Sequence, residues 1–158
     1  MKVDHRPILM GLNHSEDPDR SLLPDPPGCA GHQLWSMCYD ECGITRVDWV
    51  RLTRRGNLLT DAAPIDSYKH MARERAHHLR DLIGGEIIVL LGVDVAEAFG
   101  HREESFVWSP GPRNWIAIPH PSGRNLYWTN PVHRAAAGVL LRDIIWRCHG
   151  KRAFRPGL

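Results

Sequence analysis

The chain has 158 residues, of which 42% are hydrophobic, and this fits one compact domain that buries roughly two-thirds of its unfolded surface. Its formal charge of +2 permits a nucleic-acid partner without requiring one. No apolar run approaches the ~20 residues of a membrane span, and residues 1–10 lack a signal-peptide core. We therefore expect no membrane partner and a cytoplasmic protein, or a phage protein acting in the host cytoplasm.

The charged residues are unevenly distributed along the chain. Arginines cluster at residues 46–55, and residues 147–155 are basic and free of acidic side chains. Residues 16–25 instead contain four acidic side chains, Glu16, Asp17, Asp19 and Asp25, which outweigh Arg20. An acidic segment would repel phosphates if it lay on a nucleic-acid-binding face.

The four cysteines are Cys29, Cys38, Cys42 and Cys148. They form neither paired CxxC motifs nor the dense spacing of a disulfide scaffold, which predicts a reduced intracellular protein. Cys38 and Cys42 lie four apart on a predicted helix, where packing is a commoner role than metal ligation. We expect neither a metal nor another cofactor.

The first predicted elements are a strand, a loop and a helix. Residues 7–12, PILMGL, form a short continuous apolar run, typical of a strand buried on both faces. Residues 13–28 are dense in Asp, Ser, Pro and Gly, which predicts a loop. Residues 30–42 carry apolar side chains at helical spacing and are followed by Gly43, a candidate C-cap.

Two further strands and a helix are predicted in the middle of the chain. Residues 45–53, TRVDWVRLT, alternate apolar and polar side chains and predict a second strand. Residues 64–85 have helical spacing and end in Gly-Gly. Residues 86–92, EIIVLLG, are the clearest buried strand and are followed by a short helix over 93–100.

The last predicted elements are a strand over 114–120 and a helix over 131–150, which opens with proline and closes with glycine. The alternation of strands and helices predicts an α/β fold with a parallel sheet covered by helices on both faces, in a single domain over 1–158. Ligands of such sheets bind beyond the carboxyl ends of the strands. Two loops at that edge are notable: GLNHS at 11–15 and HPSGRN at 120–125.

These two motifs, in this order, resemble those of the uracil-DNA glycosylase superfamily. GLNHS is similar to GINPG of the mismatch-specific and thymine-DNA branch. HPSGRN is similar to HPSPRN of the single-strand-selective monofunctional branch and to NPSG of the mismatch-specific branch. HQLWSMCYDECGI, at 32–44, resembles the NRFW-type helix that follows the first motif. The resemblance implies a three-layer α/β/α sandwich around a four-stranded parallel sheet.

The resemblance also implies a monofunctional pyrimidine-DNA glycosylase that leaves an abasic site. Cleavage of the N-glycosidic bond builds positive charge on the sugar and negative charge on the departing base. His120 matches the histidine that hydrogen-bonds the pyrimidine O2, and Asn13 matches the residue that orients the attacking water. The structural alternatives are a histidine that caps a strand end and an asparagine that bonds within its own turn.

DNA binding is implied for the rest of the second motif, Ser122, Gly123, Arg124 and Asn125. Ser122 and Gly123 resemble residues that let backbone amides approach a phosphate. Arg124 matches the position that fills the gap left by a flipped nucleotide. Residues 126–128, Leu-Tyr-Trp, either serve as a wedge or anchor the helix that follows.

Substrate-binding residues are implied at Gly11, Leu12, His14, Ser15 and Pro27. His14 and Ser15 replace the proline and glycine of GINPG, and Ser15 stands where the uracil-strict branch has a bulky tyrosine. A small serine leaves room for thymine, 5-hydroxymethyluracil or a larger modified base. Pro27 stands in place of the phenylalanine that stacks on the base, and offers a weaker stacking face.

Asp48 falls near the asparagine that binds the pyrimidine edge in the uracil-specific branches. An ionised aspartate only accepts hydrogen bonds, which would favour an exocyclic amine and hence a cytosine-like base. In the alternative interpretation, the alignment slips and Asp48 pairs with Arg46 or Arg51.

The cysteine spacing does not match the iron-sulfur branches of the superfamily, so we expect no metal cluster. The expected partner is double- or single-stranded DNA, bound by a monomer. The alternative function is a non-catalytic base- or protein-binding module on the same fold, which the acidic first loop and the missing phenylalanine favour. Repair, defence against foreign DNA and phage metabolism all remain open as the biological role.

Overall fold

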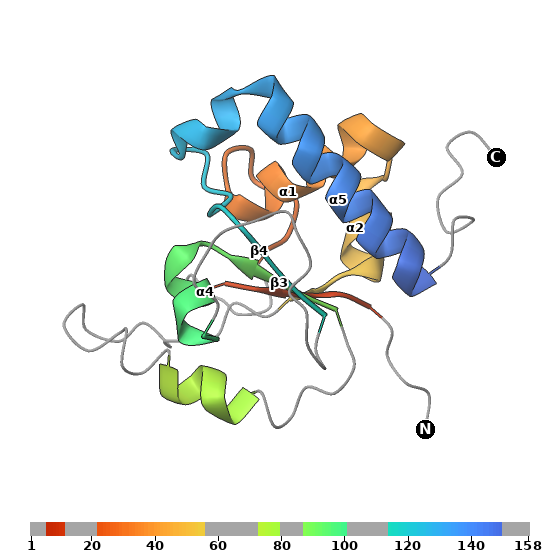
Figure 1. The fold of residues 1–158 in the computed structure, drawn as a ribbon. Helices are drawn as coiled ribbons and strands as arrows, with labels where there is room; N and C mark the ends of the chain where they lie inside the picture. The colour runs from red at the N-terminus through yellow and green to blue at the C-terminus, as the bar shows by residue number, and fades with distance from the viewer. Residues whose placement is uncertain (1–5, 12–21, 56–72, 80–86, 101–113, 150–158) are drawn as a thin grey trace. The chain divides into compact units, whose positions relative to one another are not determined.

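The computed structural model describes residues 6–11, 22–55, 73–79, 87–100 and 114–149. The chain divides into two compact units, which are described separately. The sheet unit comprises Ile8–Ser21 and Arg55–His120, and the helical unit comprises Met1–Pro7, Leu22–Arg54 and Pro121–Leu158. Figure 1 shows the elements of both.

The sheet unit is built on three parallel strands, β1 (Ile8–Met10), β3 (Ile87–Leu91) and β4 (Asn114–Ile118). β3 lies between the other two, with Val89 level with Leu9 on one side and with Ile116 on the other. The strand order is β2-β1-β3-β4, in which β2 contributes only Arg54–Arg55. The predicted α/β fold with a parallel sheet is thus confirmed for three strands.

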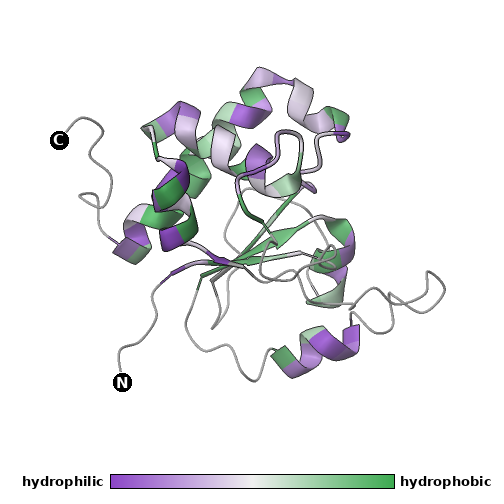
Figure 2. Cartoon of the chain, turned by 180° about the vertical axis from the view of Figure 1, so that it is seen from behind, coloured by the Kyte–Doolittle hydropathy of each residue, from purple (hydrophilic) through white to green (hydrophobic). Residues whose placement is uncertain are grey.

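Both faces of these strands are buried, as expected for parallel strands with continuous apolar sequences. On one face, Ile8, Ile88 and Leu90 pack with α4 (Val93–Ala98) and with the helix over 73–79, which contributes the fully buried Ala76. On the other face, Leu9, Val89 and Ile116 are at most 1% exposed. Figure 2 shows the resulting concentration of hydrophobic residues in the strands.

The helical unit contains α1 (Ala30–Cys42), α2 (Arg46–Leu52), the 3-10 helix η2 (Leu126–Thr129) and α5 (Pro131–His149). α1 packs against α5. Their facing sides bury Leu34, Met37 and Cys38 of α1 and Leu141 and Ile144 of α5.

Polar contacts also join these two helices. The Arg134 guanidinium donates to Oε1 of Gln33 at 2.7 Å and to Oγ of Ser36 at 2.9 Å, and the Arg142 guanidinium pairs with the Glu41 carboxylate. The apolar interface is therefore bordered by charged hydrogen bonds.

The prediction of a second strand over 45–53 is wrong, because these residues form α2. Thr45 caps the helix, and its Oγ1 accepts the backbone N–H of Asp48 at 3.1 Å. Trp49 is fully buried and its indole N–H donates to the carbonyl of Leu22 at 3.3 Å, whereas Val47 is 66% exposed. A strand would have placed Val47 and Trp49 on the same face. The sheet instead gains the two residues of β2 after this helix.

The other element predictions agree with the structure where it describes them. The helix over 30–42 ends at Gly43, which has a left-handed backbone with a φ of 71°. The strands over 86–92 and 114–120 and the helices over 93–100 and 131–150 are confirmed as β3, β4, α4 and α5. Of the helix predicted over 64–85, residues 73–79 are helical and the rest lies outside the described residues. The single domain stays a prediction.

Candidate active site

The C-terminal ends of the three parallel strands lie at the same edge of the sheet. Met10 is level with Leu90, and Leu91 is level with Ile118. β1 therefore continues into Gly11 at the same edge where β3 continues into Gly92 and β4 into Pro119 and His120. Gly11 begins the first motif and His120 begins the second, so both motifs start from one edge of one sheet.

Gly92 lies directly against His120. The backbone N–H of Gly92 donates to the carbonyl of Ile118 at 2.8 Å, which holds the end of β3 against the end of β4. A Cβ atom added to Gly92 would lie 3.2 Å from Cβ and 3.5 Å from Cδ2 of His120. Gly92 also has a φ of +101°, a conformation that disfavours other residues. A side chain at this position would crowd the histidine.

The His120 imidazole is held in its neutral form at pH 7. His120 is an exposed residue, yet the protein around it partly desolvates the ring and lowers its pKa below the ordinary value of 6.5. Burial has this effect because it penalises the charged imidazolium. A neutral imidazole carries one N–H donor and one acceptor, so His120 can donate a hydrogen bond without carrying charge.

The turn that follows His120 belongs to the helical unit and is held by its own hydrogen bonds. The Ser122 hydroxyl accepts the backbone N–H of Arg124 at 3.2 Å, and the Ser122 carbonyl accepts that of Asn125 at 3.0 Å. The Asn125 side chain in turn accepts the N–H of Tyr127 at 3.1 Å and caps η2. Arg124 is exposed at the outside of this turn.

Gly123 packs against the loop before α1. Its N–H donates to the carbonyl of Gly28 at 3.3 Å, and a Cβ added to Gly123 would lie 2.7 Å from that carbonyl oxygen. Pro27, the neighbour of Gly28, is exposed. The structure thus brings together two segments predicted to bind DNA and substrate, one containing Pro27 and the other Ser122 and Gly123.

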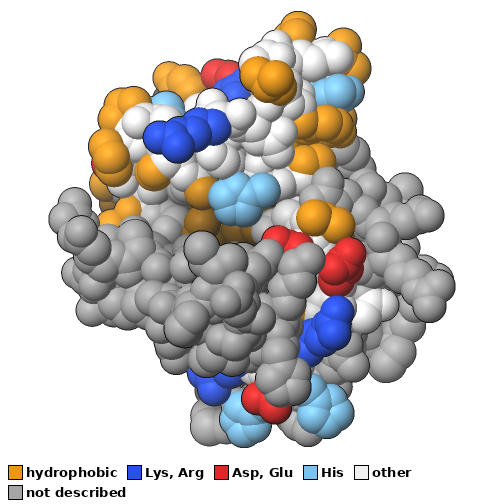
Figure 3. Space-filling model, turned by 90° about the vertical axis from the view of Figure 1, so that its left-hand side faces the viewer, with side chains coloured by type: hydrophobic (Ala, Val, Ile, Leu, Met, Phe, Trp, Pro, Cys, Tyr) orange, Lys and Arg blue, Asp and Glu red, His pale blue; other side chains and the backbone are white. Residues whose placement is uncertain are grey.

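The segment over 126–128 divides into an exposed part and an anchoring part. Trp128 is 3% exposed, and Tyr127 stacks on His133 of α5 with ring centroids 3.9 Å apart. These two side chains anchor the turn to α5. Leu126 is 80% exposed and is one of several large hydrophobic residues on the protein surface. Figure 3 shows one face of that surface, with hydrophobic side chains in orange.

Asp48 lies on α2, so the strand placement from which its base-binding role was predicted is wrong. Its carboxylate is 3.8 Å from the Arg51 guanidinium, one helical turn away. The alternative interpretation, a pairing of Asp48 with Arg51, is the one that agrees with the structure.

The remaining residues of the first motif, Leu12, Asn13, His14 and Ser15, lie outside the described residues. Their roles stay predictions.

Gly92 and Gly28 were missed as site residues, although the sequence contains an indication for Gly92. It follows a buried apolar strand, as Gly11 does, and so belongs to the same edge of a parallel sheet.

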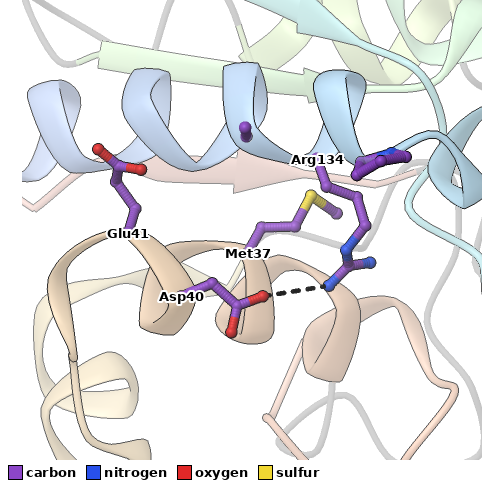
Figure 4. Close-up of a pocket in the computed structure, with 6 residues that line it drawn as sticks. Met37, Asp40, Glu41 and Arg134 are labelled. Atoms are coloured by element: carbon purple, nitrogen blue, oxygen red, sulfur yellow. Dashed lines mark ion pairs between the residues drawn. The ribbon is translucent and has the colours of Figure 1, made fainter.

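A separate pocket of about 240 Å³ lies in the helical unit between α1 and the start of α5. Figure 4 shows Arg134 directed toward Asp40, with which it forms an ion pair at 3.9 Å. The pocket is lined by Met37, Asp40, Glu41, Pro131, Arg134 and Ala135. None of the predicted site residues lines it.

Comparisons with protein-family models and with curated proteins found no match. Within the described ranges, no group of three His, Cys, Asp or Glu side chains is placed to hold a metal ion. In the same part of the chain, no helix is long and apolar enough to cross a membrane. The sheet edge and the second motif are therefore the parts of the molecule that indicate a function.

Proposed function

We propose that this protein is a monofunctional DNA glycosylase, which hydrolyses the N-glycosidic bond of uracil or of a modified or mismatched pyrimidine flipped out of DNA. The observation that supports this most is the common sheet edge from which Gly11 and His120 emerge on either side of Gly92. Neighbouring strands lie about 4.8 Å apart, so β1 and β4 are about 10 Å apart across β3.

In this proposal, the neutral His120 imidazole donates a hydrogen bond to the O2 atom of the departing pyrimidine. The bond strengthens as negative charge develops on the base, and so it stabilises the transition state more than the ground state. Asn13 orients a water molecule toward the sugar. A carboxamide cannot accept the proton of that water as a carboxylate can, so we expect a slow enzyme.

The second motif supplies the contacts to DNA. Gly123 is exposed, so a phosphate can approach this part of the turn, while the Gly123 N–H itself is bonded to the Gly28 carbonyl. Arg124, also exposed, fills the gap left in the duplex, and Leu126 adds apolar surface beside it. We further propose that the protein acts as a monomer on double- or single-stranded DNA. We also propose that its complete fold is a three-layer sandwich with four parallel strands.

In this proposal, Ser15 rather than Asp48 determines which bases the enzyme accepts. A small residue at position 15 admits a 5-substituted pyrimidine, whereas the ion pair of Asp48 with Arg51 on α2 removes the argument for a cytosine-like base. Uracil, mismatched thymine and 5-hydroxymethyluracil are the bases to test first.

The second candidate is a module on the same fold that binds a base or a protein without cleaving DNA. The exposed Pro27 favours it, because a proline ring holds a flipped base less firmly than the phenylalanine that it replaces. Such a module would bind DNA or a partner protein but would release no base.

Base release from labelled oligonucleotides distinguishes the two functions. The full chain is incubated with duplex and single-stranded oligonucleotides that carry uracil, a thymine–guanine mismatch, 5-hydroxymethyluracil or a modified cytosine, and abasic sites are then cleaved with alkali. A glycosylase yields shortened strands, and His120→Ala should lower the rate about 100-fold, the cost of removing one transition-state donor.

The exposed His77 on the helix over 73–79 provides a matched control, and His77→Ala should leave the rate unchanged. Binding of the same oligonucleotides with no strand cleavage by the wild-type chain would favour the module instead.

A further inference from the structure

Two cysteines lie in contact on consecutive turns of α1. The Sγ atoms of Cys38 and Cys42 are 3.7 Å apart, and both thiols are free. Cys38 is fully buried, whereas Cys42 is half-buried, at the last residue of the helix. Of the two residues, only Cys42 is therefore partly exposed to solvent.

The surroundings of this pair favour a thiolate on Cys42. In the protonated pair, the Cys42 thiol donates to the carbonyl of Cys38 at 3.2 Å. A hydrogen bond from the Cys38 thiol is the largest of the effects that lower the pKa of Cys42 to about 7, and the backbone of Ile44 and the charge of Arg142 on α5 act in the same direction. Partial burial and the Glu41 carboxylate oppose the shift. The same hydrogen bond and burial raise the pKa of Cys38.

We propose that Cys42 and Cys38 form a redox-reactive dithiol site that reacts with a peroxide and closes to an intrahelical disulfide. The Cys42 thiolate attacks one peroxide oxygen and the O–O bond breaks. Cys42 becomes a sulfenic acid, and the other oxygen leaves as hydroxide or alkoxide, which takes up a proton. The Cys38 sulfur then attacks the Cys42 sulfur, the S–O bond breaks and water leaves with the Cys38 proton. With hydrogen peroxide, two thiols yield one disulfide and two water molecules.

A disulfide between Cys38 and Cys42 requires the last turn of α1 to distort, because Cβ atoms four residues apart in a helix lie about 5–6 Å apart and a disulfide needs about 3.5–4.5 Å. The Cα separation already lies within range. Residues four apart in an ideal α-helix have Cα atoms about 6.2 Å apart, and disulfides span Cα separations of about 4.4–6.8 Å. The sulfurs must still approach from 3.7 Å to about 2.05 Å. Cys42 is the last helical residue, so the distortion is confined to the end of α1, where it would disturb the hydrogen bond from the Gly43 N–H to the Tyr39 carbonyl.

Cys148 provides a matched control in the same chain. It is half-buried like Cys42, but burial raises its pKa to about 11. At pH 7, the thiolate is therefore a much larger fraction of Cys42 than of Cys148. Because the less acidic thiolate is the better nucleophile, the expected ratio of alkylation rates is about 50-fold rather than several thousand-fold.

The test is made on the full chain at pH 7, in two measurements. First, timed alkylation with iodoacetamide and mass spectrometry compares Cys42 with Cys148. Second, the protein is treated with hydrogen peroxide, remaining thiols are blocked, and the chain is digested with Glu-C and chymotrypsin, which cut after Glu41 and Trp35 and so separate Cys29, Cys38 and Cys42. We expect the peptides of Cys38 and Cys42 to be joined and to separate on reduction.

Two variants identify the role of each sulfur. Cys42→Ser should abolish both the fast alkylation and the disulfide. Cys38→Ala removes the hydrogen bond that lowers the pKa of Cys42 most, so Cys42 should be alkylated more slowly than in the wild type. Its oxidation by peroxide should stop at the sulfenic acid, which dimedone traps. Alkylation of Cys42 no faster than that of Cys148, or oxidation that joins other cysteines, would overturn the proposal. The proposal does not rest on the proposed DNA glycosylase function, and neither measurement involves DNA.

Discussion

Gly92 and His120, which end neighbouring parallel strands, lie so close that a methyl group on Gly92 would come 3.2 Å from Cβ of His120. The end of the central strand thus leaves space for the histidine that opens the second motif. Because Gly92 also has a φ of +101°, two separate effects require glycine at this position.

We expect Gly92→Ala to lower the free energy of unfolding by more than the conformational cost alone. Gly92 has φ 101° and ψ 161°, a backbone region that only glycine readily occupies, and an alanine there costs about 1–3 kcal/mol. Displacement of His120 adds to this cost. Gly28→Ala is the matched control, because Gly28 has a φ of +88° but no atom within 4 Å of an added Cβ. Urea denaturation measures the free energy of unfolding of both variants. Equal losses for Gly92→Ala and Gly28→Ala would show that the contact with His120 has no energetic effect.

Replacement of Trp49 tests the helix over Arg46–Leu52. Trp49→Ala removes a fully buried side chain and its hydrogen bond to Leu22, and should lower the free energy of unfolding by about 3–5 kcal/mol. Val47→Ala changes an exposed residue of the same segment, and should cost less than about 0.5 kcal/mol. Thermal or urea unfolding measures both variants. Similar losses of unfolding free energy for the two variants would instead indicate a strand with both side chains directed inward.

The lowered pKa of His120 predicts a pH dependence of stability. Below pH 6.5 the unfolded chain binds a proton at this residue while the folded protein still resists protonation. The contribution of His120 to stability is therefore present above pH 6.5 and is lost as the pH falls through the folded pKa. His120→Gln should flatten the fall in unfolding free energy between pH 6.5 and 5, whereas His77→Gln, at an exposed position, should not. Identical slopes for the wild type and His120→Gln would contradict this expectation.

Gly123→Ala tests the contact between the second motif and the loop before α1. The added Cβ would lie 2.7 Å from the carbonyl oxygen of Gly28, so the two segments must separate, at a cost of about 1–3 kcal/mol. Ser122→Ala removes only the acceptor of the Arg124 N–H and should cost about 1 kcal/mol or less. Fluorescence anisotropy with labelled oligonucleotides should show weaker binding for Gly123→Ala than for Ser122→Ala. The reverse order would remove the turn from the proposed DNA-binding surface.

Most elements could be predicted because their determinants are local. The continuous apolar runs of β1 and β3 predict buried strands, and Gly43 and Pro131 mark helix ends by their own backbone preferences. The spacing of Cys38 and Cys42 likewise places them one helical turn apart. The charge beside them could not be predicted, because Arg142 comes from α5 and is brought to α1 only by helix packing.

The sequence by itself determined which segments are apolar enough to be buried strands and where most helices begin and end, because both depend on neighbouring residues. Only the tertiary structure decided that residues 46–52 are helical, since Trp49 is buried as one side of a helix and bonds to Leu22, 27 residues away. It also decided that β3 lies between β1 and β4, which places Gly92 against His120. Such contacts join residues distant in the chain, and no local preference encodes them.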